Sequence, residues 1–309
     1  MSETTTAEGT DGSVRIVSGF TTDRGLRREL NEDSLIVTDT LFAVADGMGG
    51  HEAGEVASGV CVRTLGESAL LSGSGQADAG REITAAQVQE LLETADARIR
   101  AETDSRAGTT LTGVVLTREA GRPYWLFFNV GDSRSYRLHQ HRLRQISVDH
   151  SEVQELVDLG HITPEEALVH PRRHVVTRAL GTGVDIAADF WLLPVEPGER
   201  ILLCSDGLTV EVTDDAIGRV LDAVADPQAA ADTLVRAALA SGGRDNVTVV
   251  VIDAVGAPDE QEPEHTTFPR ARDDVDETTL PRRGTAGSTA VPPAAAPGSP
   301  SPSGDRPGP

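Results

Sequence analysis

The chain has 309 residues, of which 38% are hydrophobic and only 3% are aromatic, a low apolar share for a chain that packs throughout. Its formal net charge of −22 argues against broad binding to nucleic acids or anionic membranes, whose phosphates would be repelled over most of the surface. No apolar run is long enough to cross a bilayer, and the acidic N-terminus lacks the basic and apolar regions of a secretory signal. We therefore expect a cytoplasmic protein.

The composition of the chain changes sharply near residue 255. Eleven of the 17 prolines lie beyond this point, in a segment with a single aromatic residue, Phe268. Such a segment buries too little apolar surface to offset the entropy of ordering it. We predict a flexible arm at 1–12, one folded domain at 13–255, and a disordered tail at 256–309 that is first acidic and then proline-rich.

The first half of the predicted domain begins with strands and continues with two helices. Alternating apolar residues predict strands at 13–20, 34–38 and 41–45. Apolar residues at helical spacing then predict helices at 54–71 and 84–103. The inward face of the first helix is expected to carry Val56, Val60, Leu65 and Leu70.

The second half is predicted to contain more strands than helices. Strands are expected at 109–116, 124–130, 135–138, 143–147, 189–193, 200–204 and 246–253. Helices are expected at 153–159, 214–225 and 227–241, and a further one begins at Thr163-Pro164, where a cap residue precedes a proline. Because many neighbouring strands have hairpin-length links, the pattern indicates an α+β fold of mostly antiparallel sheets covered by helices.

The chain has two cysteines, Cys61 and Cys204, and neither shows a metal-type spacing. Both lie in apolar segments. This favours two buried thiols over a disulfide.

Four aspartates lie next to apolar strands. Asp46, Asp132 and Asp206 each follow one, and Asp245 precedes the last. One such aspartate would be a turn former or a helix cap, but four are harder to explain, because a lone charge there is costly and carboxylates brought together repel one another. A cation would relieve that repulsion, and oxygen-only ligands favour Mg²⁺ or Mn²⁺ over zinc.

The glycines after Asp46, in the sequence DGMGG, allow two interpretations. Without side chains, they let backbone carbonyl groups approach an ion. Taken alone, the same residues predict a tight turn before the helix at Gly54.

Seven motifs occur in an order that resembles the metal-dependent protein phosphatases of type 2C, and most closely their bacterial serine/threonine branch. They are TDRGLRRELNEDS (22–34), DGMGGHEAGEVAS (46–58), GTTLTGVVL (108–116), NVGDSRSYRL (129–138), TRALG (177–181), LLCSDGL (202–208) and GGRDNVTVVV (242–251). The resemblance covers the predicted domain and fails only at the two ends. It implies a four-layer α-β-β-α sandwich with a metal site at one end of its central sheets.

The resemblance also implies a role for each acidic residue. Asp46 would bridge two Mn²⁺ or Mg²⁺ ions, with the Gly47 carbonyl on one and Asp206 and Asp245 on the other. Glu32 and Asp33 would hold metal-bound waters. Asp132 would help to form a third, weaker metal site.

Two basic residues are candidates for direct roles on the substrate. By the resemblance, Arg28 would grip the phosphate, a task suited to a planar guanidinium; the alternative is a surface ion pair with Glu29 or Glu32. His51 would donate a proton to the leaving oxygen, or is a loop or capping residue.

Other basic residues are assigned weaker or structural roles. The run HPRRH at 170–174, in the region matching the family's variable flap, either receives acidic substrate flanks or is a solvated loop. Arg134 and Arg178 are better explained as structural ion-pair partners.

The implied activity is hydrolysis of phosphoserine and phosphothreonine in proteins by a metal-bridging hydroxide, opposing serine/threonine kinases. Phosphorylated proteins, including such kinases, would be the partners. One alternative is an inactive pseudophosphatase, against which the presence of Asp46, Asp206 and Asp245 argues. Another is a phosphatase of anti-sigma-factor antagonists in a stress or sporulation pathway, which usually has an N-terminal sensory domain; we expect none in the first thirteen residues.

The tail contains one internal repeat, Thr-Thr-x-Pro-Arg, in EHTTFPR and DETTLPR. Its threonines, once phosphorylated, could bind a phosphothreonine-binding domain. The alternative is chance recurrence in a Thr/Pro/Arg-rich segment. The threonines concerned are Thr266, Thr267, Thr278 and Thr279.

Overall fold

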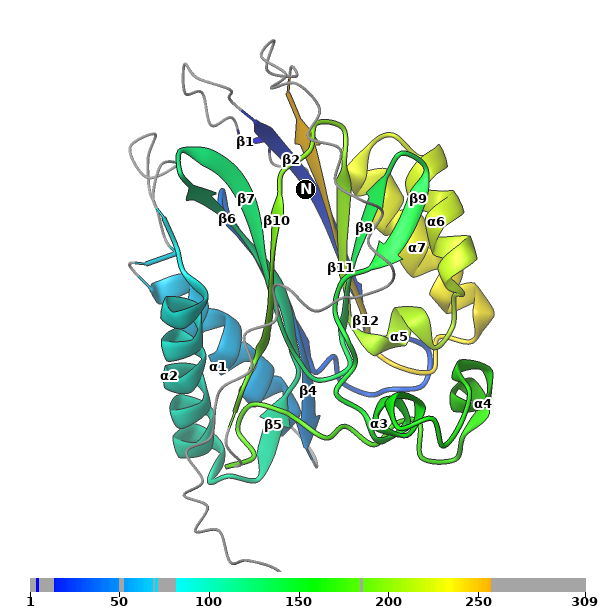
Figure 1. Cartoon of the computed structure of the whole chain (residues 1–309). Helices are drawn as coiled ribbons and strands as arrows, with labels where there is room; N and C mark the ends of the chain where they lie inside the picture. The colour runs from blue at the N-terminus through cyan, green and yellow to red at the C-terminus, as the bar shows by residue number, and fades with distance from the viewer. Residues whose placement is uncertain are drawn as a thin grey trace, which may run out of the picture.

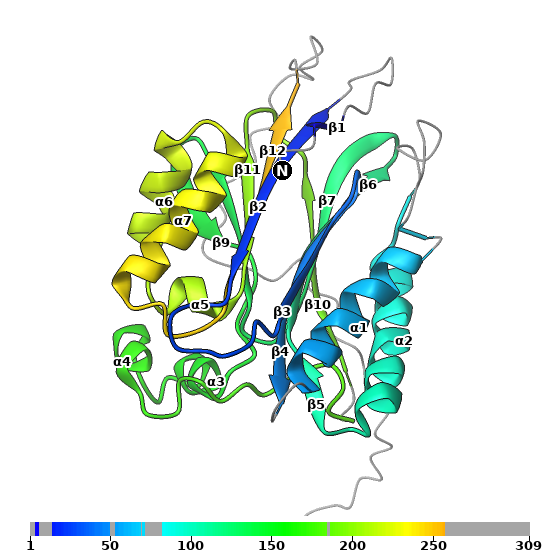
Figure 2. The same ribbon diagram turned by 180° about the vertical axis from the view of Figure 1, so that it is seen from behind.

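The computed structural model describes residues 4–5, 14–49, 53–68, 70–71, 82–183 and 186–256. Two antiparallel sheets lie face to face, and helices cover the outer face of each (Figure 1). The same four layers are seen from behind in Figure 2. This confirms the predicted α-β-β-α sandwich.

The first sheet follows the order β1-β2-β12-β11-β8-β9. Its strands are β1 (Thr4–Thr5), β2 (Arg15–Asp23), β12 (Val247–Val255), β11 (Arg200–Cys204), β8 (Arg134–His139) and β9 (Arg142–Gln145). Strands from the start, middle and end of the domain therefore lie side by side.

The second sheet follows the order β10-β7-β6-β4-β3, and β5 pairs with the end of β4. Its strands are β10 (Asp189–Pro194), β7 (Arg122–Val130), β6 (Leu111–Glu119), β4 (Leu41–Gly49), β3 (Asp33–Val37) and β5 (Ala107–Thr109).

Two pairs of helices form the outer layers. Helices α1 (Ala53–Glu67) and α2 (Ala85–Thr103) pack on the second sheet, and α6 (Asp214–Ala223) and α7 (Pro227–Ser241) pack on the first (Figures 1 and 2). The shorter helices α3 (Glu152–Asp158), α4 (Pro164–Val169) and α5 (Asp206–Thr209) lie together at one end of the first sheet.

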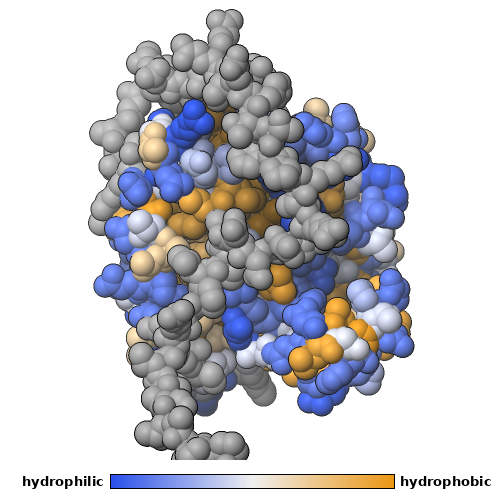
Figure 3. Space-filling view, viewed as in Figure 1, coloured by the Kyte–Doolittle hydropathy of each residue, from blue (hydrophilic) through white to orange (hydrophobic). Residues whose placement is uncertain are grey.

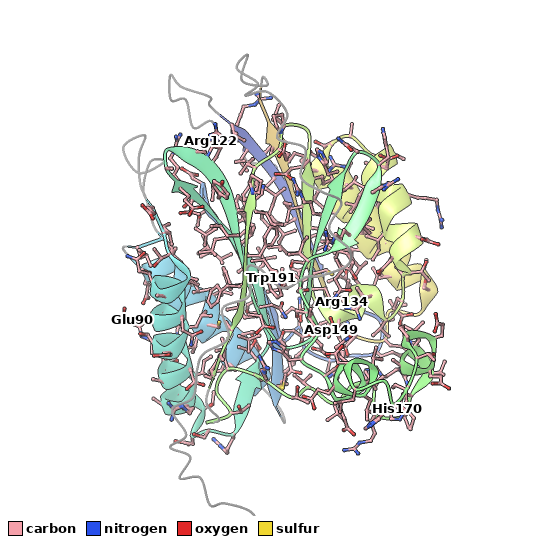
Figure 4. All side chains as sticks on the ribbon, viewed as in Figure 1. Glu90, Arg122, Arg134, Asp149, His170 and Trp191 are labelled. Atoms are coloured by element: carbon pink, nitrogen blue, oxygen red, sulfur yellow. The ribbon has the colours of Figure 1, made fainter. Side chains whose placement is uncertain are left out.

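Three apolar clusters hold the layers together. One joins the second sheet to α1 and α2, and another joins the first sheet to α6 and α7. The third lies between the sheets and includes Phe42, Trp125, Phe127 and Trp191. Figure 4 shows Trp191 in this middle layer. Alternate residues of each inner strand thus face different clusters, as expected for sheets that are covered on both faces.

Local sequence explains where several helices begin. Thr84 and Gln87 form a reciprocal capping box at the start of α2, and Thr163 and Glu166 form another at α4. Asp226 caps α7 by accepting a hydrogen bond from the Ala229 N–H.

The structure corrects several of the predicted elements, three of which bear on the pocket or on the packing of α1. β4 continues through Asp46 to Gly49, because residues 47–49 pair with β5, so the interpretation of this segment as a tight turn is wrong. Helix α1 ends at Glu67, and Val56 on it is 40% exposed rather than inward-facing. The four-residue helix α5 after Ser205 was not predicted.

Both cysteines are buried and unpaired, as predicted. Burial raises the pKa of the Cys61 thiol to about 12. Burial likewise raises the pKa of the Cys204 thiol, so neither thiol is a nucleophile at neutral pH.

Other sequence predictions fall on residues that are not described. The tail threonines of the Thr-Thr-x-Pro-Arg repeats lie outside the described residues, and the domain boundaries at 12/13 and 255/256 stay a prediction. Among the helices of the described part, none combines the length and apolar character that a bilayer crossing requires.

Apolar side chains are exposed on the α3–α4 segment. Leu159, Leu168 and Val169 are each more than two-thirds exposed, and orange surface marks this corner of the molecule in Figure 3.

Candidate active site

A pocket of about 510 Å³ opens where the two sheets meet at one end. Five carboxylates line it. One is Glu32, and the others are four aspartates: Asp46 on β4, Asp132 after β7, Asp206 at the start of α5, and Asp245 before β12. Two of these aspartates come from each half of the sandwich. The predicted gathering of the four aspartates in one place is therefore what the structure shows.

The strand register aligns the acidic residues of the second sheet. Asp33 on β3 lies opposite Asp46 on β4, and the Gly47 N–H donates to the Glu32 carbonyl at 3.1 Å. On the other side of β4, the Thr110 N–H donates to the Asp46 carbonyl at 2.9 Å. The Asp46 backbone is thus fixed from both sides.

Only glycine fits at position 47, because there is no room for a side chain. A Cβ at this position would lie 2.1 Å from the Gly54 carbonyl oxygen, so any side chain would displace the start of α1. The backbone at 47 consequently remains bare at the pocket wall, which it lines.

Asp33 ties the two sheets together beneath the pocket. The Ser205 hydroxyl donates to its Oδ2 at 2.8 Å, and the Thr248 hydroxyl donates to the same atom at 2.7 Å. Its Oδ1 is buried with no hydrogen-bond partner in the described part of the chain. A buried carboxylate oxygen with no partner is costly unless some further group satisfies it.

Asn246 positions the loop that carries Arg28. Its side-chain amide donates to the carbonyl groups of Arg24 and Leu30 at 2.9 and 2.8 Å, and its Oδ1 accepts from the Glu32 N–H at 2.8 Å. The sequence reasoning did not identify Asn246, although it directly follows Asp245.

The carboxylates raise one another's pKa values. Burial, followed by the charges of neighbouring aspartates, raises the pKa of Asp132 to about 7 and that of Asp206 to about 6. Burial also raises the pKa of Asp33 to about 7, against the hydrogen bonds from Thr248 and Ser205. The pKa of Asp46 lies well above its usual value for the same reasons, with Asp33 the largest of the charged contributors. The pocket therefore holds more negative charge than its own cations balance.

Arg28 forms its shortest ion pair with Asp245, which the sequence did not predict, and a longer one with Glu32, which it did. Its Nη2 lies 2.6 Å from Asp245 Oδ2, and its Nη1 lies 3.9 Å from Glu32. The alternative partner Glu29 is not engaged by the Arg28 side chain. Because Arg28 lines the pocket and is half-exposed, its guanidinium remains within reach of an anion there.

The residues fit a hard divalent cation by their chemistry. Carboxylates and the Gly47 backbone line the pocket, and Asp33 has an unpartnered oxygen. Burial, and after it the charges of neighbouring carboxylates, raises the pKa values of these aspartates, and a cation would offset both effects. As they stand, no three His, Cys, Asp or Glu side chains of the described residues converge closely enough to enclose an ion. Asp245 is engaged by Arg28, so a cation and the guanidinium compete for this carboxylate.

The pocket also has basic residues that the sequence reasoning identified only in part. Arg173 and His174, from the basic run at 170–174, line it together with Arg244. Arg244 was missed because its position depends on Glu211, to which it donates through Nε and Nη2 at 2.8 and 3.0 Å. Nothing in the local sequence around Arg244 signals that contact.

Arg134 and Arg178 have the structural roles predicted for them. Arg134 pairs with Asp149 at 2.6 Å, and the two side chains meet in Figure 4. Arg178 lies 3.3 Å from Asp189. The remaining predicted site residue, His51, lies outside the described residues.

Comparison with known proteins identifies close relatives. The family profile "Protein phosphatase 2C" matches residues 27–242. The serine/threonine protein phosphatase PstP of Mycobacterium tuberculosis is 43% identical over 244 residues, which cover 75% of this chain but 44% of PstP. The chain thus spans less than half of that relative. The serine/threonine phosphatase stp of Listeria monocytogenes is 36% identical over 252 residues, covering 76% of this chain and 94% of stp.

A solved structure of similar fold contains metal. It is the catalytic domain of PstP in complex with two manganese ions, which is 38% identical, has a TM-score of 0.64, and covers 78% of this chain and 99% of its own.

Proposed function

This chain belongs to the protein phosphatase 2C family, and on that premise we propose that it hydrolyses phosphoserine and phosphothreonine in proteins with Mn²⁺ or Mg²⁺ as cofactor. The observation that carries the proposal is the set of four aspartates and Glu32 in one pocket, lined also by Arg28 and the bare backbone of Gly47. The two manganese ions in the PstP catalytic domain support the choice of cofactor.

We assign Asp46, the Gly47 carbonyl, Asp206 and Asp245 to hold two cations, and Asp132 to a third, weaker site. Glu32 and Asp33 would accept hydrogen bonds from waters around them. Cations bound there supply Lewis acidity, which acidifies water and neutralises phosphoryl oxygens.

The chain's own residues perform the remaining steps. Arg28 has a planar guanidinium that binds two phosphoryl oxygens at once, which orients the phosphorus atom toward the carboxylate side of the pocket. Arg28 is half-exposed, so its guanidinium can turn from its 2.6 Å ion pair with Asp245 toward a phosphate in the pocket. His51 would then protonate the departing serine or threonine oxygen.

The retained carboxylates argue against the alternative of an inactive pseudophosphatase. Opposition to serine/threonine kinases, a pathway of anti-sigma-factor antagonists, and a cytoplasmic location are further predictions from the sequence. Activity on a phosphorylated kinase would support the first of these.

The direct test is hydrolysis of a phosphothreonine peptide and of p-nitrophenyl phosphate by the purified chain. Turnover is expected with added Mn²⁺ and is expected to stop with EDTA. Full activity in excess EDTA would contradict the proposed cofactor, and no turnover with Mn²⁺ or Mg²⁺ would contradict the proposed activity.

The role of His51 has its own test in the leaving group. His51→Ala should slow hydrolysis of a phosphothreonine peptide, whose alkoxide leaving group needs a proton, far more than that of p-nitrophenyl phosphate. Comparison of kcat for the two substrates gives the answer. Equal losses on both would remove the assignment of His51 as the acid.

A further inference from the structure

The pocket contains more basic side chains than a single phosphate needs. Arg28 is joined there by Arg173, His174 and Arg244. The pocket volume of about 510 Å³ also exceeds what one phosphoryl group fills, and lies in the usual range for sites that bind larger ligands. Arg173, His174 and Arg244 have no part in the activity proposed above.

Arg244 is held in a fixed position with donors to spare. Its Nε and Nη2 donate to the two oxygens of Glu211, whose side chain is only 2% exposed, and its backbone N–H donates to the same carboxylate at 3.1 Å. The guanidinium has five N–H donors, so this clamp leaves Nη1 and one proton of Nη2 available. The position of Arg244 is therefore set before any ligand arrives, which lowers the entropic cost of binding one.

Arg173 has a charge that no carboxylate of the described residues pairs with. Its Nη1 donates to the His170 carbonyl at 3.3 Å, which leaves the charge itself unbalanced. Its neighbour Arg172 differs, because it is paired with Glu152 at 2.6 Å and does not line the pocket. Of these two adjacent arginines, Arg173 alone is placed to meet a ligand in the pocket.

His174 lies within the field of these groups. Partial burial, followed by the charge of Arg173 and with a contribution from Arg244, lowers its pKa. At neutral pH its imidazole is therefore an uncharged N–H donor. The basic side chains of the flap and of the loop before β12 thus act on one small region.

We propose that Arg173 and Arg244, with His174, form a second anion subsite, which binds a carboxylate or a second phosphate one or two residues away from the phosphorylated residue. This inference rests on the proposed function and names its substrate class: phosphoserine or phosphothreonine segments with an acidic or doubly phosphorylated flank. The subsite offsets, at close range, the repulsion that such substrates meet from a chain of net charge −22.

Three matched phosphothreonine peptides test the subsite in the full chain with Mn²⁺. The first has neutral flanks, the second has one glutamate beside the phosphothreonine, and the third has a second phosphothreonine there. We expect kcat/KM to be about tenfold higher for at least one of the two peptides with an anionic flank, a typical gain for one added charged contact. The preference should shrink as salt is added, because partly exposed charges are screened.

Variants locate the effect. Arg173→Gln should bring the ratio of kcat/KM values close to one, and Arg173→Lys, which keeps the charge, should restore most of it. Arg244→Gln combined with Glu211→Gln should also lower the ratio without leaving Glu211 as an unpaired buried carboxylate. Arg172→Gln is the matched control, and its ratio should equal that of the wild type.

The outcomes separate this inference from the function on which it rests. A gain with the second phosphothreonine alone would assign the subsite to phosphate, and a gain with glutamate would assign it to carboxylates as well. Equal kcat/KM for the three peptides, or a preference that survives in both the Arg173→Gln and Arg244→Gln/Glu211→Gln variants, would overturn the subsite. No turnover of any peptide would instead contradict the proposed phosphatase activity.

Discussion

The two ends of strands β11 and β12 differ in how their buried charged side chains are paired. At the end away from the pocket, Arg200 pairs with Asp253 at 2.6 Å and also donates to the carbonyl groups of Leu221, Val224 and Ala225. Nearby, Glu199 accepts from Arg137 and from the Trp125 indole. At the pocket end, Asp206 and Asp245 are accompanied by Asp46 and Asp132, with fewer cations than anions.

This difference separates charges that serve stability from charges that serve a ligand. Paired groups at the far end satisfy one another within the chain, so nothing further is needed there. At the pocket end, the residual repulsion destabilises the protein by itself and becomes useful when a cation binds. Variants at the two ends should therefore have separable effects on activity and stability.

The largest effect is expected for Asp206→Asn at the pocket end. The change removes a proposed cation ligand, and kcat/KM on a phosphothreonine peptide should fall by at least ~10³-fold, the scale of a key charge-stabilising group. Without metal, the melting temperature should stay the same or rise, because one member of a mutually repelling group is gone. Near-wild-type activity would show that the cation assignment is wrong.

Arg200→Met should have the reverse pattern. It leaves Asp253 without its partner and three carbonyl groups without a donor, so the free energy of unfolding should fall by about 3–5 kcal/mol. Urea denaturation measures this loss, and kcat at a temperature where the variant is folded should be unchanged. A double variant, Arg200→Met with Asp253→Leu, should recover part of the lost free energy of unfolding. A large loss of kcat in the folded single variant would contradict the claim that charges at this end serve stability alone.

The pH dependence of stability should report the pocket end. Burial raises the pKa values of Asp33 and Asp132 to about 7 and that of Asp206 to about 6, above the usual aspartate value of 3.8. The metal-free folded chain therefore holds protons that the unfolded chain has released. Their contribution to the free energy of unfolding therefore decreases as pH rises from about 4 to about 7, and it levels off above that range.

Mn²⁺ should reverse this trend, because it binds the ionised carboxylates. The rise in melting temperature on adding Mn²⁺ should be larger at about pH 8 than at about pH 5.5, as thermal unfolding with and without the ion would reveal. Asp206→Asn should flatten the metal-free pH profile. An identical Mn²⁺ shift at both pH values would contradict the coupling between protons and cation.

The smallest effect on stability is expected for Ser205→Ala, which removes a hydrogen-bonded hydroxyl at the pocket end. Its hydroxyl donates to Asp33 and accepts from the Thr248 N–H at 2.9 Å, so its loss should cost about 1–3 kcal/mol in free energy of unfolding. Ser135→Ala is the control, because the equally buried Ser135 hydroxyl has no partner among the described residues. Similar losses for both would show that hydrogen bonding to Asp33 does not matter.

Much of the fold was predictable because local patterns and packing agree. Helix α7 occupies the predicted residues 227–241, since Asp226 caps it and Pro227 takes its first position. The extension of β4 to Gly49 was not predictable, because aspartate and glycine disfavour strands and only pairing with β5 keeps this segment extended.

The candidate site was likewise predictable only in part. The motif order indicated Asp46, Asp132, Asp206 and Asp245, and the pocket contains all four. The contact between Arg28 and Asp245 joins residues 217 positions apart, and the Arg244 clamp depends on Glu211, 33 positions away. Such pairings follow from the layering of the sheets and leave no trace in the neighbouring sequence.

The hydrogen bonds from Ser205 and Thr248 to Asp33 have a mechanical consequence. They cross from one sheet to the other, directly under a pocket whose acidic walls come from both. A shear of one sheet against its partner would therefore alter the spacing between Asp46 and Asp206. Substitutions in the aromatic cluster between the sheets, which includes Phe127 and Trp191, are therefore expected to change kcat even though none of these residues lines the pocket.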